Sequence, residues 1–145
     1  MPHLTVSAVV VSDAEGRVLT VRKRDTGAFM FPGGKPEPGE EPGAAAIREA
    51  REELGVGIDP GDLEYLGTWE TDAANEAGYG LTGHVYRWVG SEKALEGRVL
   101  EPRAEIDELR WVFPEDGEPM ADLAPLTRDC VFPALASRAP ASGKN

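Results

Sequence analysis

Three glutamates on one predicted helix are the residues of this chain best suited to chemistry. Glu49, Glu52 and Glu53 lie in the segment 42–54, which follows a turn rich in proline and glycine. At about 100° per residue, their spacing places them on one helical face. Carboxylates gathered in this way form either a solvated acidic surface or a site for a hard cation, because oxygen ligands suit Mg²⁺ or Mn²⁺.

The segment 42–54 also carries the end signals of a helix. Pro42 suits the first helical position, where its missing N–H is not needed. Gly55 suits the left-handed residue that follows a helix. A second stripe of the segment is apolar and consists of Ala46, Ile47, Ala50 and Leu54. We expect this stripe to pack on a sheet, which leaves the three carboxylates at the edge of that sheet.

The spacing of fixed residues from 34 to 56 resembles the Nudix box, G-x5-E-x7-R-E-U-x-E-E-x-G-U, in which U is a bulky aliphatic residue. The matching positions are Gly34, Glu40, Arg48, Glu49, Glu52, Glu53, Gly55 and Val56. The one departure is Ala50, a small residue at an aliphatic position, and it touches no ligand. The preceding FPGG, residues 31–34, is also typical of the family.

The resemblance implies an enzyme that uses a divalent metal, Mg²⁺ or Mn²⁺, to hydrolyse a nucleoside diphosphate linked to another group. It implies that Glu52 and Glu53 are catalytic and are the strongest metal ligands, with Glu49 completing the cluster. The backbone carbonyl of Gly34 is a further candidate ligand, because glycine lets the chain approach an ion closely.

Arg48 has the opposite charge, and the resemblance implies an orienting, catalytic role for it. It is expected to brace Glu49 or Glu52 and to pair with Glu40 across the loop. Two alternatives stay open. Arg48 can be a simple surface ion pair, and Glu40 can serve only as a favourable negative charge at the helix N-terminus.

A general base is needed to activate water, and the family takes it either from the box or from a later loop. Glu101, Glu105 and Glu108 precede the last predicted strand. We predict Glu105 as the base, with Glu108 as the second choice. The alternative is that all three side chains only face solvent.

The predicted substrate contacts are Lys23, Arg24 and Phe31. Lys23 ends a predicted strand and resembles a position where related enzymes place a basic residue near phosphate or base. Phe31 is able to stack on a base, although core packing is the competing role. The polar segment 72–80, with Asn75 and Glu76, is predicted to be a loop at the mouth of the site.

Features outside the box bear on the substrate. ADP-ribose hydrolases often carry a proline where this chain has Thr71, and Tyr79 lies too far along for a dinucleoside-polyphosphate enzyme. The chain is similar to MutT-type nucleotide-pool enzymes, which cleave nucleoside triphosphates to the monophosphate and pyrophosphate. The alternatives are an ADP-ribose, nucleotide-sugar or coenzyme A pyrophosphatase, an enzyme acting on RNA 5′ ends, and a catalytically silent nucleotide-binding module.

Composition limits the partners. The 145 residues carry a formal net charge of −11, whereas a protein that binds long nucleic acid normally presents a basic face. The longest apolar run, residues 8–11, is far too short to span a membrane. We expect a cytoplasmic monomer or homodimer that acts on a small nucleotide.

Strands are predicted at 3–12, 17–23, 63–71, 81–89 and 108–113, the first two as a hairpin. With the helix at 42–54 and weak helical character from 120 to 136, interrupted at Pro125 and Pro133, the order predicts an α+β protein. Its architecture is an α/β/α sandwich around a mixed β-sheet, which the Nudix resemblance also implies. Residues 1–138 are expected to form one domain, and residues 139–145 a disordered tail.

Overall fold

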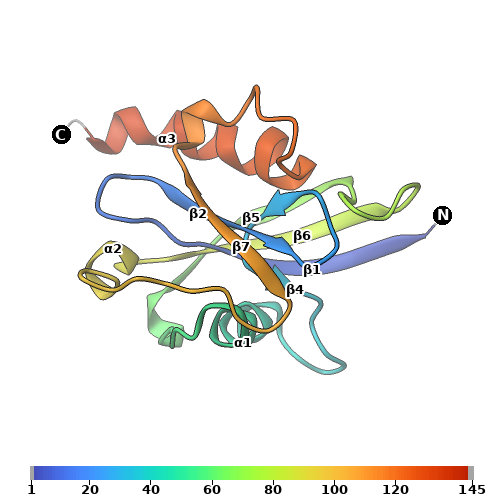
Figure 1. Cartoon of the computed structure of the whole chain (residues 1–145), viewed down its shortest axis with the longest axis horizontal. Coiled ribbons are helices and arrows are strands. Elements are labelled where there is room, and N and C mark those ends of the chain that lie inside the picture. The colour runs from blue at the N-terminus through green and yellow to red at the C-terminus, as the bar shows by residue number, and fades with distance from the viewer. Residues whose placement is uncertain (1, 144–145) are drawn as a thin grey trace.

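The computed structural model describes residues 2–143, with side-chain positions up to residue 137. The strands form a central layer between α1 (Pro42–Leu54) on one side and a C-terminal helical layer on the other (Figure 1). The predicted α/β/α sandwich is therefore confirmed.

One part of the central layer is a four-stranded mixed sheet with the order β4-β1-β6-β5. Its strands are β1 (His3–Val10), β4 (Gly33–Gly34), β5 (Leu63–Asp72) and β6 (Gly80–Trp88). β1 pairs with β6 in parallel, whereas β4 and β5 pair with their neighbours in antiparallel fashion. The short strand β4 thus fixes the glycine turn against the buried centre of β1.

The other part is a three-stranded antiparallel sheet with the order β3-β2-β7. Its strands are β2 (Val18–Lys23), β3 (Phe29–Met30) and β7 (Ile106–Val112). The first two strands were predicted to form a hairpin. They pair only next to the turn, through a hydrogen bond of 2.9 Å from the Leu19 N–H to the Val11 carbonyl, and the rest of the predicted hairpin is wrong. The two strands then separate, because each is buried on both faces and pairs with a partner from much later in the chain.

The core has two halves. Under α1, Val9, Val11 and Leu19 pack against Ala46 and Ala50, and all five side chains are 0% exposed. Ala50, the one departure from the box pattern, is thus fully buried between α1 and the strands. On the opposite face a second cluster includes Val10, Val85, Phe31, Leu126 and Phe132.

The remaining elements are short except at the C-terminus. They are η1 (Pro60–Asp62), α2 (Ser91–Ala94), η2 (Pro114–Asp116), the π-helix η3 (Leu126–Val131) and α3 (Phe132–Gly143). Residues 120–124, which were predicted to be weakly helical, are not helical, and the helical run begins at Pro125. Pro133 does not interrupt this run. The wider π turns before it accommodate the missing proline N–H.

The assigned helix α3 continues to Gly143, and the disorder expected for residues 139–145 stays a prediction. Residues 144 and 145 lie outside the described residues. None of the helices within residues 2–143 combines the length and the apolar character needed to cross a bilayer.

Candidate active site

Glu53 is the most unusual carboxyl group of the protein. Its side chain is only 1% exposed, and its Oε1 accepts a hydrogen bond from the Gly33 N–H at 3.2 Å. Among the described residues, its Oε2 has no hydrogen-bond partner. Burial raises the pKa of Glu53 to about 8, opposed by the nearby positive charge of Lys23 and reinforced by the negative charge of Glu49. A cation bound beside this carboxyl group would favour its ionised form.

Glu49 lies directly against the glycine turn. A Cβ atom added to Gly34 would overlap the Glu49 carboxylate, so only glycine allows this close approach. Since β4 carries Gly33 and Gly34, the strand meets both the Glu49 and the Glu53 carboxyl groups. The pairing of Gly34 with Ser7 of β1 holds this junction in place.

Arg48 organises the acids from the outer side of α1. Its Nε and Nη2 donate to the two carboxylate oxygens of Glu40, each at 2.9 Å. Its Nη1 donates to Glu49 at 3.1 Å and its Nη2 to the Lys35 carbonyl at 3.2 Å. The Arg48 hydrogen bonds, with that from the Glu37 N–H, lower the pKa of Glu40 to about 2. Arg48 therefore connects the glycine loop to the acidic helix, which is more than a simple surface pair.

Glu52 lies differently from the other two acids. Its side chain is 53% exposed, and its contact with Arg48 Nη1 is 3.5 Å long. Within residues 2–143, no three acidic, histidine or cysteine side chains already stand close enough together to form a metal site. The acidic helix therefore offers two carboxyl groups at the β4 junction and a third at its exposed edge.

The residues nevertheless suit a divalent cation. The free Oε2 of buried Glu53, the adjacent Glu49 carboxylate and the backbone of Gly34 are all hard oxygen donors, which Mg²⁺ and Mn²⁺ prefer. A cation here would also neutralise the Glu53 carboxylate, whose ionisation in a buried position is otherwise unfavourable in free energy.

Of the three candidate bases, Glu105 is the one that contacts Lys23, the residue whose positive charge acts on Glu53. The Glu105 Oε2 is 3.4 Å from Lys23 Nζ, and the Glu105 side chain is 58% exposed. Glu108 is instead held by Arg22 Nε at 3.0 Å between β2 and β7, and Glu101 is exposed. The strand end of β2 therefore brings Lys23 and Glu105 together near the acids.

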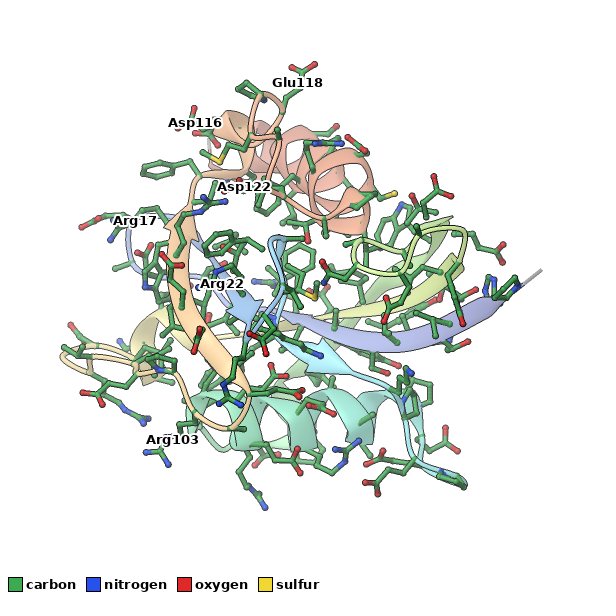
Figure 2. All side chains as sticks on the ribbon, turned by 45° about the vertical axis from the view of Figure 1, so that its right-hand side comes forward. Arg17, Arg22, Arg103, Asp116, Glu118 and Asp122 are labelled. Carbon is green, nitrogen blue, oxygen red and sulfur yellow. The ribbon has the colours of Figure 1, made fainter. Side chains whose placement is uncertain are left out.

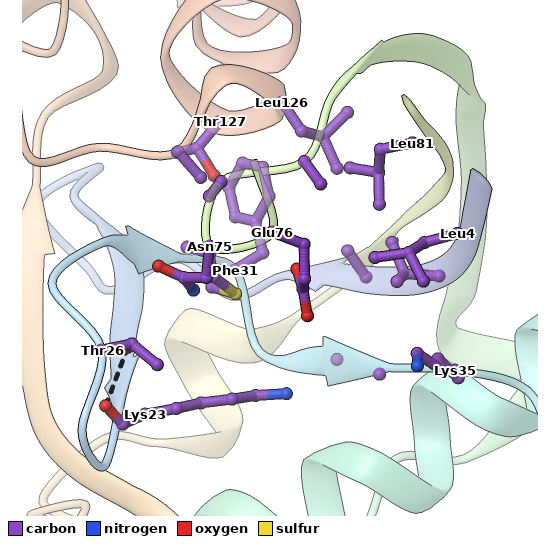
Figure 3. Close-up of a pocket in the computed structure, with 18 of the residues that line it drawn as sticks. Leu4, Lys23, Thr26, Phe31, Lys35, Asn75, Glu76, Leu81, Leu126 and Thr127 are labelled. Carbon is purple, nitrogen blue, oxygen red and sulfur yellow. Dashed lines mark hydrogen bonds between the residues drawn. The ribbon is translucent and has the colours of Figure 1, made fainter. Parts of the chain in front are cut away.

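A cavity of about 200 Å³ adjoins the acidic junction. Lys23 and β4 lie on one side of it, and Leu126 and Thr127 of η3 lie on the other (Figure 3). The 72–76 segment also lines it, so Asn75 and Glu76 lie where a loop at the mouth of a site was predicted.

The other two predicted substrate contacts differ in placement. Phe31 lines the cavity, but it is 4% exposed and packs edge-on against Phe132 at a centroid distance of 5.8 Å. These contacts are those of core packing, the competing role, and stacking of Phe31 on a base stays a prediction. Arg24 is not among the cavity-lining residues, and its Nη2 donates to the Ala104 carbonyl at 3.1 Å.

Sequence reasoning missed two features of the site. Thr127 lines the cavity from η3, where a weakly helical pattern gave no signal. Arg103 supports the end of α1, since its N–H donates to the Glu53 carbonyl at 3.1 Å and its guanidinium lies against Gly55. Figure 2 shows Arg103 beside α1. It lies far from any box residue in sequence, and no local pattern marks it.

Comparison with known proteins agrees with this geometry. A MutT-like protein of Streptomyces ambofaciens is 29% identical over 121 residues, covering 83% of this chain and 70% of that protein. An RNA pyrophosphohydrolase of Halorhodospira halophila is 42% identical over 59 residues, covering 41% of this chain but only 32% of that protein. The solved structure of the ORF135 protein of E. coli has a TM-score of 0.69 and 26% identity, covering 97% of this chain and 94% of that one.

The family model described as NUDIX domain matches residues 1–134, which is nearly the whole chain. The matched region contains the acidic helix, the glycine turn and the residues that line the cavity. The chain belongs to the Nudix hydrolase family.

Proposed function

We propose that this protein is a divalent-metal-dependent pyrophosphohydrolase whose substrate is a nucleoside triphosphate, cleaved to the monophosphate and pyrophosphate. The observation that carries the proposal is the buried Glu53 with its free Oε2, placed beside Glu49 and the glycine turn at the edge of a cavity. The similarity to a MutT-like protein agrees with the resemblance to MutT-type enzymes, which implies this substrate class.

Glu49, Glu52, Glu53 and the Gly34 carbonyl would hold the metal. A bound Mg²⁺ or Mn²⁺ supplies charge neutralisation for the phosphates and a lowered pKa for a water molecule. The protein contributes the rest. Arg48 hydrogen-bonds both the Glu49 carboxylate and the Lys35 carbonyl, which holds the helix and the loop in fixed positions relative to each other. The Gly33 N–H orients the Glu53 carboxyl through Oε1.

Glu105 is the proposed general base. Its exposed carboxylate is able to accept a proton from water, and the Lys23 ammonium at 3.4 Å directs it toward the acidic junction. Lys23 also lines the cavity, where its positive charge favours a phosphate group and offsets the protein's net charge of −11.

The test is a product-release assay with Mg²⁺ or Mn²⁺ on nucleoside triphosphates, ADP-ribose, dinucleoside polyphosphates and coenzyme A. We expect pyrophosphate release from at least one nucleoside triphosphate and none from the Glu53→Gln variant. Preferential cleavage of ADP-ribose or coenzyme A would overturn the substrate class. Equal activity of Glu53→Gln would overturn the role of Glu53.

A second candidate is hydrolysis at RNA 5′ ends, which the partial match to an RNA pyrophosphohydrolase favours. The net charge of −11 disfavours it, because RNA binding depends on neutralising phosphates with Lys and Arg. Triphosphorylated and capped RNA oligonucleotides in the same assay separate the two candidates. Faster release from these RNAs than from any free nucleotide would support the second.

A further inference from the structure

Thr127 is a buried polar residue that the catalytic roles above do not use. It is 0% exposed, and in the part of the chain that the structure describes its Oγ1 has no hydrogen-bond partner. Figure 3 shows its hydroxyl directed into the cavity, toward Phe31 and Asn75. An unpaired buried hydroxyl destabilises a fold, so its presence at a cavity wall points to a ligand that pairs with it.

The local backbone explains how the hydroxyl is held. Thr127 is the second residue of η3, and its carbonyl accepts the N–H of Phe132, five residues later. Such π turns are rare and occur frequently at functional sites. The carbonyl of Thr127 is thus satisfied by the helix, and only its side chain remains available to the cavity.

The cavity has an apolar part and a polar part. Leu4 and Leu81 of the sheet and Leu126 of η3 line the apolar part, and Asn75 and Glu76 line the loop side (Figure 3). The cavity volume of about 200 Å³ is below the roughly 300–1,000 Å³ of pockets that enclose a whole ligand. The space therefore suits one flat ring with a polar edge, while charged groups stay outside.

The position of the cavity relative to the acids indicates that the ring is the nucleobase of the substrate. Lys23 and the glycines of β4 lie on the side opposite Thr127 (Figure 3), and the metal-binding acids adjoin these glycines. A substrate with its phosphates at the acids would thus place its base beside Thr127.

We propose that Thr127 is a specificity-determining residue whose hydroxyl hydrogen-bonds a polar edge of the nucleobase. This inference rests on the proposed function, since it requires a nucleotide substrate. A hydroxyl both donates and accepts, so Thr127 selects for a base that has a polar group at this edge and against a ring that lacks one. Discrimination of this kind arises because the wrong ring leaves the buried hydroxyl unpaired.

The experiment compares wild type, Thr127→Val and Thr127→Ser on two substrates. One is the nucleoside triphosphate that the wild type cleaves best, and the other is 1,2-dideoxyribose 5-triphosphate, which has no base. Thr127→Val keeps the shape and removes the hydroxyl. We expect it to lower kcat/KM for the nucleoside triphosphate about 5- to 20-fold, the scale of one hydrogen bond, and to change the baseless substrate less than about twofold. Thr127→Ser should restore most of the loss.

Thr20 provides the matched control. Its side chain is also 0% exposed, but its Oγ1 donates to the Arg110 carbonyl at 2.8 Å and it does not line the cavity. Thr20→Val should lower the melting temperature and leave the ratio of the two kcat/KM values unchanged. Thr127→Val should melt at or above the wild-type temperature, because it removes an unpaired buried group.

An equal effect of Thr127→Val on both substrates, or no effect on either, would overturn the inference. Calorimetric titration with nucleoside 5′-monophosphates without metal separates it from the proposed function. If the wild type cleaves no nucleoside triphosphate but binds a monophosphate more tightly than Thr127→Val does, the base contact stands and the proposed reaction fails. Equal binding by both proteins refutes the base contact.

Discussion

Substitution of Glu53 by Gln in the metal-free protein should raise stability while it removes activity. The wild-type carboxyl is buried, and its pKa is raised from 4.5 to about 8. At pH 7 the unfolded chain therefore holds this group as a carboxylate, whereas the folded protein holds it mainly protonated. Folding is opposed by the free energy of taking up that proton.

The magnitude follows from the two pKa values. Stability is unaffected by this group below pH 4.5 and falls as the pH rises from 4.5 toward 8, because the unfolded state releases its proton first. At about 1.4 kcal/mol per pH unit, pH 7 corresponds to roughly 3 kcal/mol. The amide of Gln keeps an acceptor for Gly33 N–H but leaves its own N–H groups unpaired, which opposes the gain by about 1–2 kcal/mol. The net expectation is a stabilisation of about 1–2 kcal/mol.

The assay is thermal unfolding in EDTA at pH 5 and pH 7.5. For a domain of this size, the melting temperature of Glu53→Gln should exceed that of the wild type by about 3–8 °C at pH 7.5, and the difference should shrink or reverse at pH 5. Glu52→Gln is the control, because its side chain is 53% exposed and its removal should change stability little. A destabilised Glu53→Gln at pH 7.5, or the same difference at both pH values, would refute the reasoning.

Three further predictions concern the groups around Glu53. Arg48→Lys loses the paired hydrogen bonds to Glu40, so kcat/KM should fall about 10- to 100-fold; an unchanged value in steady-state kinetics would reduce Arg48 to a surface pair. Glu105→Gln should lower kcat about 10²- to 10⁴-fold with little change in melting temperature, and wild-type turnover would move the base elsewhere. Gly34→Ala should displace the Glu49 carboxylate and weaken Mn²⁺ binding measured by calorimetric titration, whereas Gly27→Ala, with open space around it, should not.

The part of the fold that is encoded locally was predictable from the sequence. Pro42 begins α1, and Gly55, with φ of 73°, ends it, because both residues act through their own backbone geometry. Helical spacing also predicted that Glu49, Glu52 and Glu53 gather at one spot, and the structure places Glu49 and Glu53 at the glycine turn. The outward position of Glu52 was not predicted, because the burial of Glu53 and the exposure of Glu52 depend on how α1 packs on the strands.

Long-range features escaped prediction for the same reason. The separation of β1 and β2 into two sheets depends on β6 and β7, whose paired residues lie 77 to 94 positions later in the chain. Thr127 reaches the cavity only because η3 crosses over the strands, and one threonine in a weak helical pattern gives no sign of it. Arg24 and Lys23 are adjacent in sequence, yet only Lys23 lines the cavity.

The hydrogen bond from Gly33 N–H to the Glu53 carboxyl makes one backbone amide a spectroscopic probe of the candidate active site. An oxygen of Glu53 is able to accept this bond whether the carboxyl is neutral or charged, but charged acceptors make shorter and stronger hydrogen bonds. The proton resonance of this amide therefore registers whether the carboxyl is protonated or ionised, without any label on the substrate. Because β4 pairs with the buried strand β1, the signal is insulated from movements of the exposed loops around the cavity.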